Sequence, residues 1–336
     1  MDNRHTELEL LQLQALPLDL KIKMAKRRIE DWYNYFGGKV AISFSGGKDS
    51  TILVHLVRSV YPDVEAVFVD TGLEYPSLKN FVKSFDNVRI LRPKKSFKQV
   101  LTDYGYPIFS KEIADKINLG QNAIRTGRAD AKVFKYFDES YDSVLNVAKY
   151  KPLLTVDFRV SKTCCAVMKK RPIHEYIKET GNHFYVGTMA AESLTRARQW
   201  IKRGCNAYDL AVPTSKPLSI WTDSDILEYA VRNNLSISEP YGSIVKFGCK
   251  YVTTGCNRTG CIFCGYGAHL DRGKRFRELM DQAPALYEYC MGGGEYNESG
   301  YWVPNNEGLG FKHVYDTINS IYGEKFIKYK PDRRLF

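Results

Sequence analysis

The chain begins with a helical pattern of apolar residues. Over residues 7–36, leucine, isoleucine, methionine and tryptophan recur on one side of a helical projection, which predicts amphipathic helix. Pro17 divides this stretch, because proline removes a backbone N–H and clashes with the preceding turn, so two helices are expected. The pair Gly37-Gly38 is expected to end the second helix.

An alternation of short apolar runs and amphipathic stretches follows. Strands that alternate with helices form parallel sheets, and the helices then cover the sheet faces. The expected fold class is therefore α/β, a doubly wound, mostly parallel, Rossmann-like sheet with helices on both faces. The predicted strands are residues 40–44, 64–70, 88–91 and 183–186, and helices are predicted at 51–60 and 77–85.

The residue composition changes after residue 240. Gly, Cys, Asn and Tyr become frequent there, and the predicted helices become short. We expect three consecutive parts: an N-terminal helical segment at 1–36, a nucleotide-binding domain at 37–240 and a small Cys-rich C-terminal unit at 241–336. Residues 110–150 are polar and helical, and we expect them to form an insertion over the sheet.

Composition narrows the classes of partner and compartment. The 336 residues carry 49 Lys+Arg against 38 Asp+Glu, and the net charge of +11 favours anionic partners such as nucleotides or nucleic acid. No apolar run is long enough for a membrane span, and the first residues lack the apolar core of a secretory signal. We therefore expect a cytoplasmic protein with no membrane partner. In a reducing compartment, its eight cysteines are expected to be metal or redox ligands rather than disulfides.

The clearest chemical signal is a glycine-rich loop at residues 45–50, Ser-Gly-Gly-Lys-Asp-Ser, between a predicted strand and a predicted helix. Glycines let backbone N–H groups turn inward, and the start of a helix carries a partial positive charge, so this is the place for a phosphate. Lys48 adds a mobile cation, and Asp49 would cap the helix or hold a magnesium ion. The loop differs from the G-x-x-x-x-G-K-[ST] pattern, because only one residue separates Gly46 from Lys48. The alternative is a tight glycine turn into a capped helix.

The segment Phe44–Ser50 resembles the PP-loop of the ATP pyrophosphatases, which adenylate a substrate and release pyrophosphate. Further segments resemble, in the same order, motifs of one branch of that class, the phosphoadenosine phosphosulfate (PAPS) reductase family. One departure is Met189, which stands where that family usually has an arginine that contacts phosphate or sulfate. The resembling segments are Asp70–Pro76, Tyr104–Pro107 with Ser110–Glu112, Gly187–Arg196 and Lys216–Asp225.

The resemblance implies an adenine nucleotide, ATP or a relative, bound with Mg²⁺ beyond the carboxyl ends of the strands. Lys48, Asp49 and Arg196 are the expected catalytic residues. Two alternatives stay open: Asp70 to Gly72 would form a helix cap, and Glu192 with Arg196 would form an ordinary surface ion pair. The expected nucleotide-binding residues are Ser43, Ser45, Gly46, Gly47, Lys48, Asp49, Ser50, Asp70, Thr71, Gly72 and Gly187.

The tandem pair Cys164-Cys165 and the later Cys261-x-x-Cys264 can each place two sulfurs on one metal centre. This combination resembles the iron–sulfur adenosine-phosphosulfate reductases and related sulfurtransferases, and on that resemblance these four cysteines hold a [4Fe–4S] cluster. Cys256 is the rival fourth ligand, and zinc is the competing metal. The remaining cysteines, Cys205, Cys249 and Cys290, are expected to be structural, with Cys249 as a spare sulfur carrier.

The resembled reductases attack sulfur with a cysteine in a C-terminal tail, and this sequence has no cysteine after Cys290. The intact loop favours ATP instead. The predicted function is sulfur transfer to an acceptor such as nucleic acid, in which the acceptor is first adenylated and pyrophosphate is released. The expected partner is a cysteine-desulfurase-like sulfur donor or a thiol reductant. The protein could be a monomer or an oligomer. One alternative is an adenylyl- or phosphoadenylyl-sulfate reductase that produces sulfite through Cys249 or Cys290. Another is a zinc-stabilised nucleic-acid-binding protein with a vestigial nucleotide site.

Overall fold

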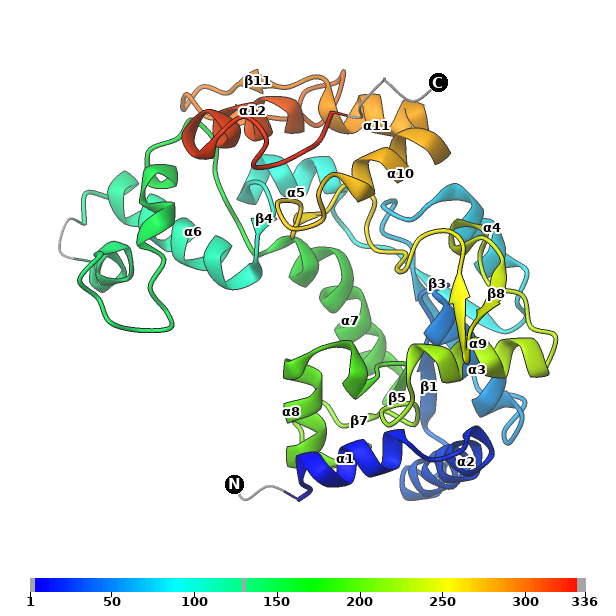
Figure 1. Ribbon diagram of the computed structural model, residues 1–336. Helices are drawn as coiled ribbons and strands as arrows, with labels where there is room; N and C mark the ends of the chain where they lie inside the picture. Colours follow the sequence, from blue (N-terminus) through cyan, green and yellow to red (C-terminus); the bar gives the residue numbers. More distant parts are fainter. Residues whose placement is uncertain (1–3, 129–130, 331–336) are drawn as a thin grey trace. The chain divides into compact units, whose positions relative to one another are not determined.

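The computed structural model describes residues 4–128 and 131–330 (Figure 1). Contacts divide the chain into two compact units, each built from several stretches. The predicted domain boundaries at residues 36 and 240 stay predictions, because a division by contacts does not show which parts of the chain fold independently. Residues 1–3 and 331–336, which belong to the predicted terminal parts, lie outside the described residues. The first unit comprises Met1–Asp70, Glu74–Arg92 and Pro172–Thr259, and the second comprises Thr71–Leu73, Pro93–Arg171 and Gly260–Phe336.

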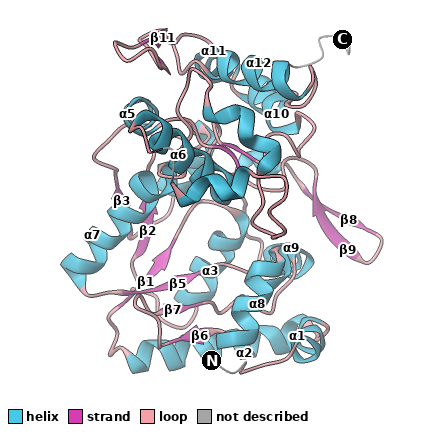
Figure 2. Ribbon diagram, turned by 90° about the vertical axis from the view of Figure 1, so that its left-hand side faces the viewer, coloured by secondary structure: helices cyan, strands magenta, loops and turns pink. Residues whose placement is uncertain are grey.

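A six-stranded sheet forms the centre of the first unit (Figure 2). Its order is β3-β2-β1-β5-β7-β6, and every neighbouring pair is parallel except β6 with β7. The order runs backwards from β3 to β1 and then turns forward at β5, so the topological switch lies between β1 and β5. The strands are β1 (Val40–Ser43), β2 (Ala66–Val69), β3 (Val88–Leu91), β5 (His183–Val186), β6 (Asn206–Ala207) and β7 (Thr214–Ser215).

Helices cover both faces of this sheet, as predicted. Neighbouring residues of a strand point to opposite faces. Phe184 packs in a core cluster with Tyr176 of α7, whereas the hydroxyl of the next residue, Tyr185, donates to the carbonyl of Ile29 in α2 at 2.8 Å. The helices of this unit are α1 (Glu7–Gln14), α2 (Leu18–Tyr35), α3 (Lys48–Arg58), α4 (Pro76–Lys83), α7 (Arg171–Thr180), α8 (Leu194–Arg203) and α9 (Asp223–Arg232), with short turns η4 (Ala190–Glu192) and η5 (Glu239–Tyr241) and a hairpin of β8 (Ile244–Phe247) and β9 (Lys250–Thr253).

The second unit is mainly helical and has an aromatic core that includes Tyr106, Phe109, Phe311 and Tyr315, each at most 2% exposed. Residues 110–150 belong to this unit by their contacts, and their predicted place as an insertion over the sheet stays a prediction. Its elements are α5 (Phe97–Tyr104), β4 (Ile108–Phe109), α6 (Lys111–Arg125), η1 (Lys132–Phe137), η2 (Ala148–Leu154), the π-helical turn η3 (Ala166–Lys170), β10 (Gly265–Tyr266), α10 (Lys274–Gln282), α11 (Pro284–Met291), β11 (Glu295–Tyr296), β12 (Trp302–Val303) and α12 (Phe311–Tyr322).

Among the described residues, none of the helices combines the length and the apolar character that crossing a lipid bilayer requires.

Candidate functional site

The glycine-rich loop joins β1 to α3 at the carboxyl edge of the sheet, directly at the topological switch. Open α/β sheets bind their ligands at this place. Gly187 follows β5, the neighbouring strand, and a Cβ atom added there would lie 3.1 Å from the carbonyl oxygen of Asp49. The end of β5 therefore packs closely against the start of α3, and a side chain at position 187 would make this contact tight.

Hydrogen bonds within the loop fix its shape. The Ser45 and Ser50 hydroxyls lie 3.1 Å apart, and the Ser50 hydroxyl donates to the Gly47 carbonyl at 2.9 Å. Gly47 is the N-cap of α3. It has no side chain that could accept a hydrogen bond from the backbone N–H groups in the first turn of this helix. Helix starts of this kind present N–H groups to an anion.

Gly46 is required by both backbone and space. Its φ of +72° favours glycine, and an added Cβ would lie 2.7 Å from Leu78 and from Val82. We expect Gly46→Ala to lower the free energy of unfolding by about 1–3 kcal/mol in urea denaturation. Gly181→Ala is the matched control, since its φ is +70° but nothing lies within 4 Å of the added Cβ. An equal loss in both variants would contradict the packing argument.

Lys48 is buried in the loop and held by two carboxylates. Its Nζ lies 3.0 Å from Asp49 Oδ1 and 3.0 Å from Asp223 Oδ1. Burial lowers the pKa of Lys48, but the two carboxylates outweigh it and leave the pKa above its ordinary value of 10.5. Burial raises the pKa of Asp49, and the attraction of Lys48 opposes this rise. The loop therefore holds a cation that stays charged at neutral pH.

Tyr241, at the end of η5, completes the wall of the loop. Its hydroxyl accepts from the Lys48 backbone N–H at 3.2 Å and shares a hydrogen bond with the Thr259 hydroxyl at 3.1 Å. Burial raises the pKa of Tyr241. A Cβ on Gly47 would lie 3.2 Å from the Tyr241 hydroxyl, so the second loop glycine makes this contact possible. Sequence analysis missed Tyr241 and Thr259, because no local pattern marks either residue.

Arg196 brings a second cationic group toward the loop. It pairs with Glu192, the i,i+4 pair that the sequence allowed, and Glu192 also pairs with Arg258 at 3.4 Å. Burial lowers the pKa of Arg196. The positive charge of Arg258 lowers this pKa further and the negative charge of Asp49 raises it, so Arg196 interacts with both groups. Arg258 was not predicted. Met189 is 1% exposed and packs in the interior, where it offers no charge to a ligand.

The other predicted nucleotide ligands fall on both units. Ser43 is the last residue of β1. Asp70 follows β2, and its carboxylate pairs with Lys79 at 2.8 Å and more distantly with Arg92. Thr71 and Gly72 belong to the second unit by their contacts. The structure thus gathers Ser43, residues 45–50, Gly187 and Arg196 in the first unit, and the nucleotide-binding roles stay predictions.

Four cysteines gather in the second unit. Burial raises the pKa of the Cys164 thiol, and Cys165, Cys261 and Cys264 each raise it further. Burial also raises the pKa of Cys264, opposed by the Tyr266 N–H and by the positive charges of Arg275 and Lys169. The predicted ligands therefore lie within electrostatic reach of one another. In residues 4–128 and 131–330, no three His, Cys, Asp or Glu side chains form a group that could hold one metal ion.

Hydrogen bonds join the two cysteine segments. The Tyr266 hydroxyl, two residues after Cys264, donates to the Ser161 carbonyl at 3.0 Å, three residues before Cys164. A turn closes the later pair, because the Cys264 N–H donates to the Cys261 carbonyl at 3.1 Å. The pairing of β10 with β4 fixes the chain directly after Cys264.

The remaining cysteines separate into two classes. Cys205 and Cys290 are 6% and 0% exposed, which fits the structural roles predicted for them. Cys249 is exposed at the turn between β8 and β9, and its predicted role, structural or as a spare sulfur carrier, stays a prediction. Cys256, the rival ligand, is buried and belongs to the first unit.

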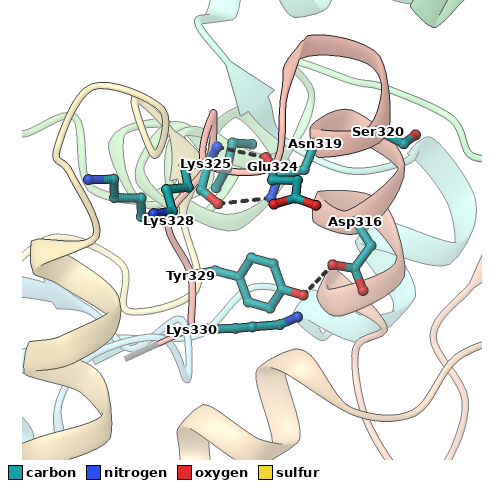
Figure 3. Close-up of a pocket in the computed structure, with 9 residues that line it drawn as sticks. Asp316, Asn319, Ser320, Glu324, Lys325, Lys328, Tyr329 and Lys330 are labelled. Carbon is teal, nitrogen blue, oxygen red and sulfur yellow. Dashed lines mark hydrogen bonds between the residues drawn. The ribbon is translucent and has the colours of Figure 1, made fainter. Parts of the chain in front are cut away.

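A separate cavity of about 640 Å³ lies in the second unit (Figure 3). The Asn319 side chain bridges to Ile327, donating to its carbonyl at 3.1 Å and accepting from its N–H at 2.8 Å, and Tyr329 donates to Asp316. None of the predicted site residues lines this cavity. Its lining is Asp316, Asn319, Ser320, Glu324, Lys325, Ile327, Lys328, Tyr329 and Lys330.

Comparison with known proteins gives a family match. The family model described as phosphoadenosine phosphosulfate reductase domain matches residues 39–115 and 124–265, which is more than half of the chain. The matched residues include the loop and all four clustered cysteines.

Two uncharacterised proteins of Methanocaldococcus jannaschii are similar to this chain. One is 24% identical over 227 residues, or 66% of this chain and 40% of that protein. The other is 34% identical over 245 residues, or 70% of this chain and 38% of that protein. The chain thus spans about two fifths of the length of these relatives.

Proteins with a named activity are also similar. The adenosine 5'-phosphosulfate reductase of Lysinibacillus sphaericus is 25% identical over 225 residues, which cover 67% of this chain and 74% of the reductase. Among solved structures, the phosphoadenylyl-sulfate reductase of Candida auris, a phosphate complex, is 14% identical with a TM-score of 0.39 and covers 73% of this chain and 97% of that one.

Proposed function

This chain belongs to the phosphoadenosine phosphosulfate reductase family, and we propose that it is an enzyme that binds ATP at residues 45–50. The enzyme adenylates an acceptor with release of pyrophosphate and then transfers sulfur to that acceptor. The observation that carries the proposal is the complete loop. Lys48 stands between Asp49 and Asp223 at the start of α3, beside N–H groups that the N-cap glycine does not satisfy. The β- and γ-phosphates of ATP have the charge and the acceptor oxygens for these groups.

The loop residues suit the departure of pyrophosphate. An oxygen of the acceptor attacks the α-phosphorus, the bond from that phosphorus to the bridging oxygen breaks, and pyrophosphate carries away the electron pair. A sulfide-level sulfur nucleophile from the donor then attacks the acceptor atom that bears the adenylated oxygen, and AMP leaves with that oxygen and its electron pair. The N–H groups of the loop and Lys48 stabilise the charge that develops on the leaving pyrophosphate. Arg196, which interacts with Asp49, is placed to neutralise a further phosphate.

Asp49 fits a magnesium ligand. Mg²⁺ is usually bound through one or two carboxylates together with substrate phosphates and water. Asp49 supplies the carboxylate within the loop, and its side chain is 23% exposed. Its present partner, Lys48, would exchange the carboxylate for a phosphate when ATP and Mg²⁺ enter together.

The four cysteines of the second unit fit a [4Fe–4S] cluster. A single zinc ion with Zn–S bonds of about 2.3 Å draws its sulfurs to within about 4 Å of one another. In a cluster each thiolate binds a different iron, so the sulfurs stand further apart. The electrostatic interaction of Cys164 with the other three thiols supports a centre shared by all four cysteines. When bound, the cluster would supply redox-active, sulfur-rich chemistry, and Lys169 and Arg275 would offset thiolate charge.

A second candidate is a sulfonucleotide reductase, which the similarity to the adenosine 5'-phosphosulfate reductase of Lysinibacillus sphaericus favours. Such an enzyme needs a reactive thiolate. Cys290 is unsuited, because it is fully buried and burial raises its pKa well above the ordinary value. Cys249 is the exposed alternative.

Product analysis separates the two candidates. Anaerobically purified protein is incubated with ATP, Mg²⁺ and cell-derived acceptor, or with adenosine 5'-phosphosulfate and a thiol reductant. We expect AMP and pyrophosphate from ATP. Sulfite from the sulfonucleotide, lost in the variant Cys249→Ser, would establish the second candidate in place of the first.

A further inference from the structure

The hairpin of β8 and β9 in the first unit has two different faces. Cross-strand partners share a face, and successive residues alternate between faces. One face is anchored: Ile244, Tyr251 and Thr253 are half-buried, and the Tyr251 N–H donates to the Ser224 hydroxyl of α9 at 3.3 Å. The opposite face, which we call the hairpin face, consists of the register pairs Val245 with Val252 and Phe247 with Lys250.

The apolar side chains of the hairpin face are exposed to water. Phe247 is 77% exposed, and Val245 and Val252 are 41% and 39% exposed. Exposing apolar surface costs about 25 cal/mol per Å², so an aromatic ring and two valines in contact with water indicate a binding surface. Lys250 is exposed beside Phe247.

The base of the hairpin is joined to the loop at residues 45–50. Tyr241 directly precedes the hairpin and binds the Lys48 N–H, and the Gly255 N–H after β9 donates to the Tyr241 carbonyl at 2.8 Å. Ser224, which anchors β9, follows Asp223, the partner of Lys48. The hairpin that would hold a ligand is therefore attached through Tyr241, which contacts Lys48, and through Ser224, whose neighbour Asp223 also contacts Lys48.

The chain segment that forms the hairpin carries positive charges and no negative ones. From residue 240 to residue 270 the sequence contains Lys246, Lys250 and Arg258 and no Asp or Glu. Lysines that meet phosphates and an aromatic ring on which a base stacks are the combination that binds single-stranded nucleic acid. A standard protein interface needs about 20–30 residues a side, whereas single strands occupy sites from about four nucleotides upward, which matches a face of this size.

We propose that the hairpin face binds single-stranded nucleic acid by stacking a base on Phe247 and pairing a phosphate with Lys250, which is the register partner of Phe247 on the same face. We further infer that this strand is the acceptor brought to the loop, a step that rests on the proposed adenylating function. Binding of the strand itself requires neither ATP nor a cluster.

Fluorescence anisotropy with labelled single-stranded DNA and RNA of about 15 nucleotides tests the binding. Stacking on an aromatic side chain contributes about 1–3 kcal/mol per base, so Phe247→Ala is expected to weaken binding by about 5- to 150-fold. The variant Lys250→Ala should reduce the slope of log K against log salt by about one, whereas Lys246→Ala, on the opposite face beside Tyr251, should change it less.

Two control variants match these changes. Tyr296→Ala removes an aromatic side chain, 57% exposed, from the β11–β12 hairpin, which carries Glu295 and Glu298. Lys23→Ala removes an exposed lysine from α2. Both should bind oligonucleotides as the unchanged protein does. Equal losses in the control and hairpin variants would overturn the proposal, as would unchanged binding in Phe247→Ala.

The design separates this proposal from the proposed function. We expect Lys48→Met to lose ATP binding while keeping oligonucleotide binding, and Phe247→Ala to show the reverse. A protein that binds ATP but no single strand would refute the hairpin proposal alone. If an acidic protein, rather than a nucleic acid, were bound in a Phe247-dependent way, the assigned class of partner would be wrong.

Discussion

Replacing Lys48 with methionine is expected to lower kcat/KM for pyrophosphate release from ATP by about 100- to 1,000-fold, the usual cost of losing one donor to developing charge. Lys48 is the cation within the loop, and its raised pKa keeps it charged throughout the neutral range. Methionine preserves the length of the buried side chain, so the loss reports charge rather than packing. Steady-state release of pyrophosphate, with ATP affinity measured separately, gives the result.

The matched control is Lys39→Met, an exposed lysine directly before β1 and thus at the opposite end of the strand that leads into the loop. It removes the same charge and should leave kcat/KM unchanged. Thermal unfolding shows whether Lys48→Met remains folded with Asp49 and Asp223 deprived of their partner. A folded Lys48→Met protein with unaltered ATP affinity would contradict the assignment of the loop.

Replacing Cys164 with serine is expected to reduce iron and acid-labile sulfide in anaerobically prepared protein from about four of each per chain to well below one. Cys164 is the most buried of the four clustered cysteines, and the pKa of its thiol responds to the other three. Losing one buried ligand leaves an iron without its thiolate inside the protein. Iron and sulfide analysis, with the visible absorption band, measures the outcome.

Cysteines outside the group provide the controls. Cys249→Ser alters an exposed thiol and should retain the metal content. Cys256→Ser decides the rival ligand set: full retention of iron supports the four cysteines of the second unit, and loss equal to that of Cys164→Ser would place Cys256 among the ligands. Protein that contains one zinc per chain and no sulfide would refute the cluster.

The sheet and its loop were predictable from the sequence because their signals are local. The strands β1, β2, β3 and β5 are short apolar runs, and the loop lies directly between one such run and a helix. The two-residue strands β6 and β7 are polar or small and were not predicted. Pro17 separates α1 from α2 as predicted, since proline at the start of a helix costs no hydrogen bond.

The partners of the loop were not predictable in the same way. Asp223 and Tyr241 contact Lys48 across 175 and 193 positions of the chain, so no short pattern connects them. Thr222 caps α9 and thereby places Asp223 in the first turn of that helix. The exposure of Cys249 was not predictable from composition either, because cysteine is commonly buried, and the register of β8 with β9 places this one in an exposed turn.

A crystal structure with Mg²⁺ and a non-hydrolysable ATP analogue tests the central claim most directly. The account predicts the β- and γ-phosphates within hydrogen-bonding distance of the N–H groups at residues 46–50, with Lys48 Nζ moved from Asp223 onto a phosphate. Phosphates bound elsewhere, with Lys48 still paired to both carboxylates at saturating analogue, would contradict it.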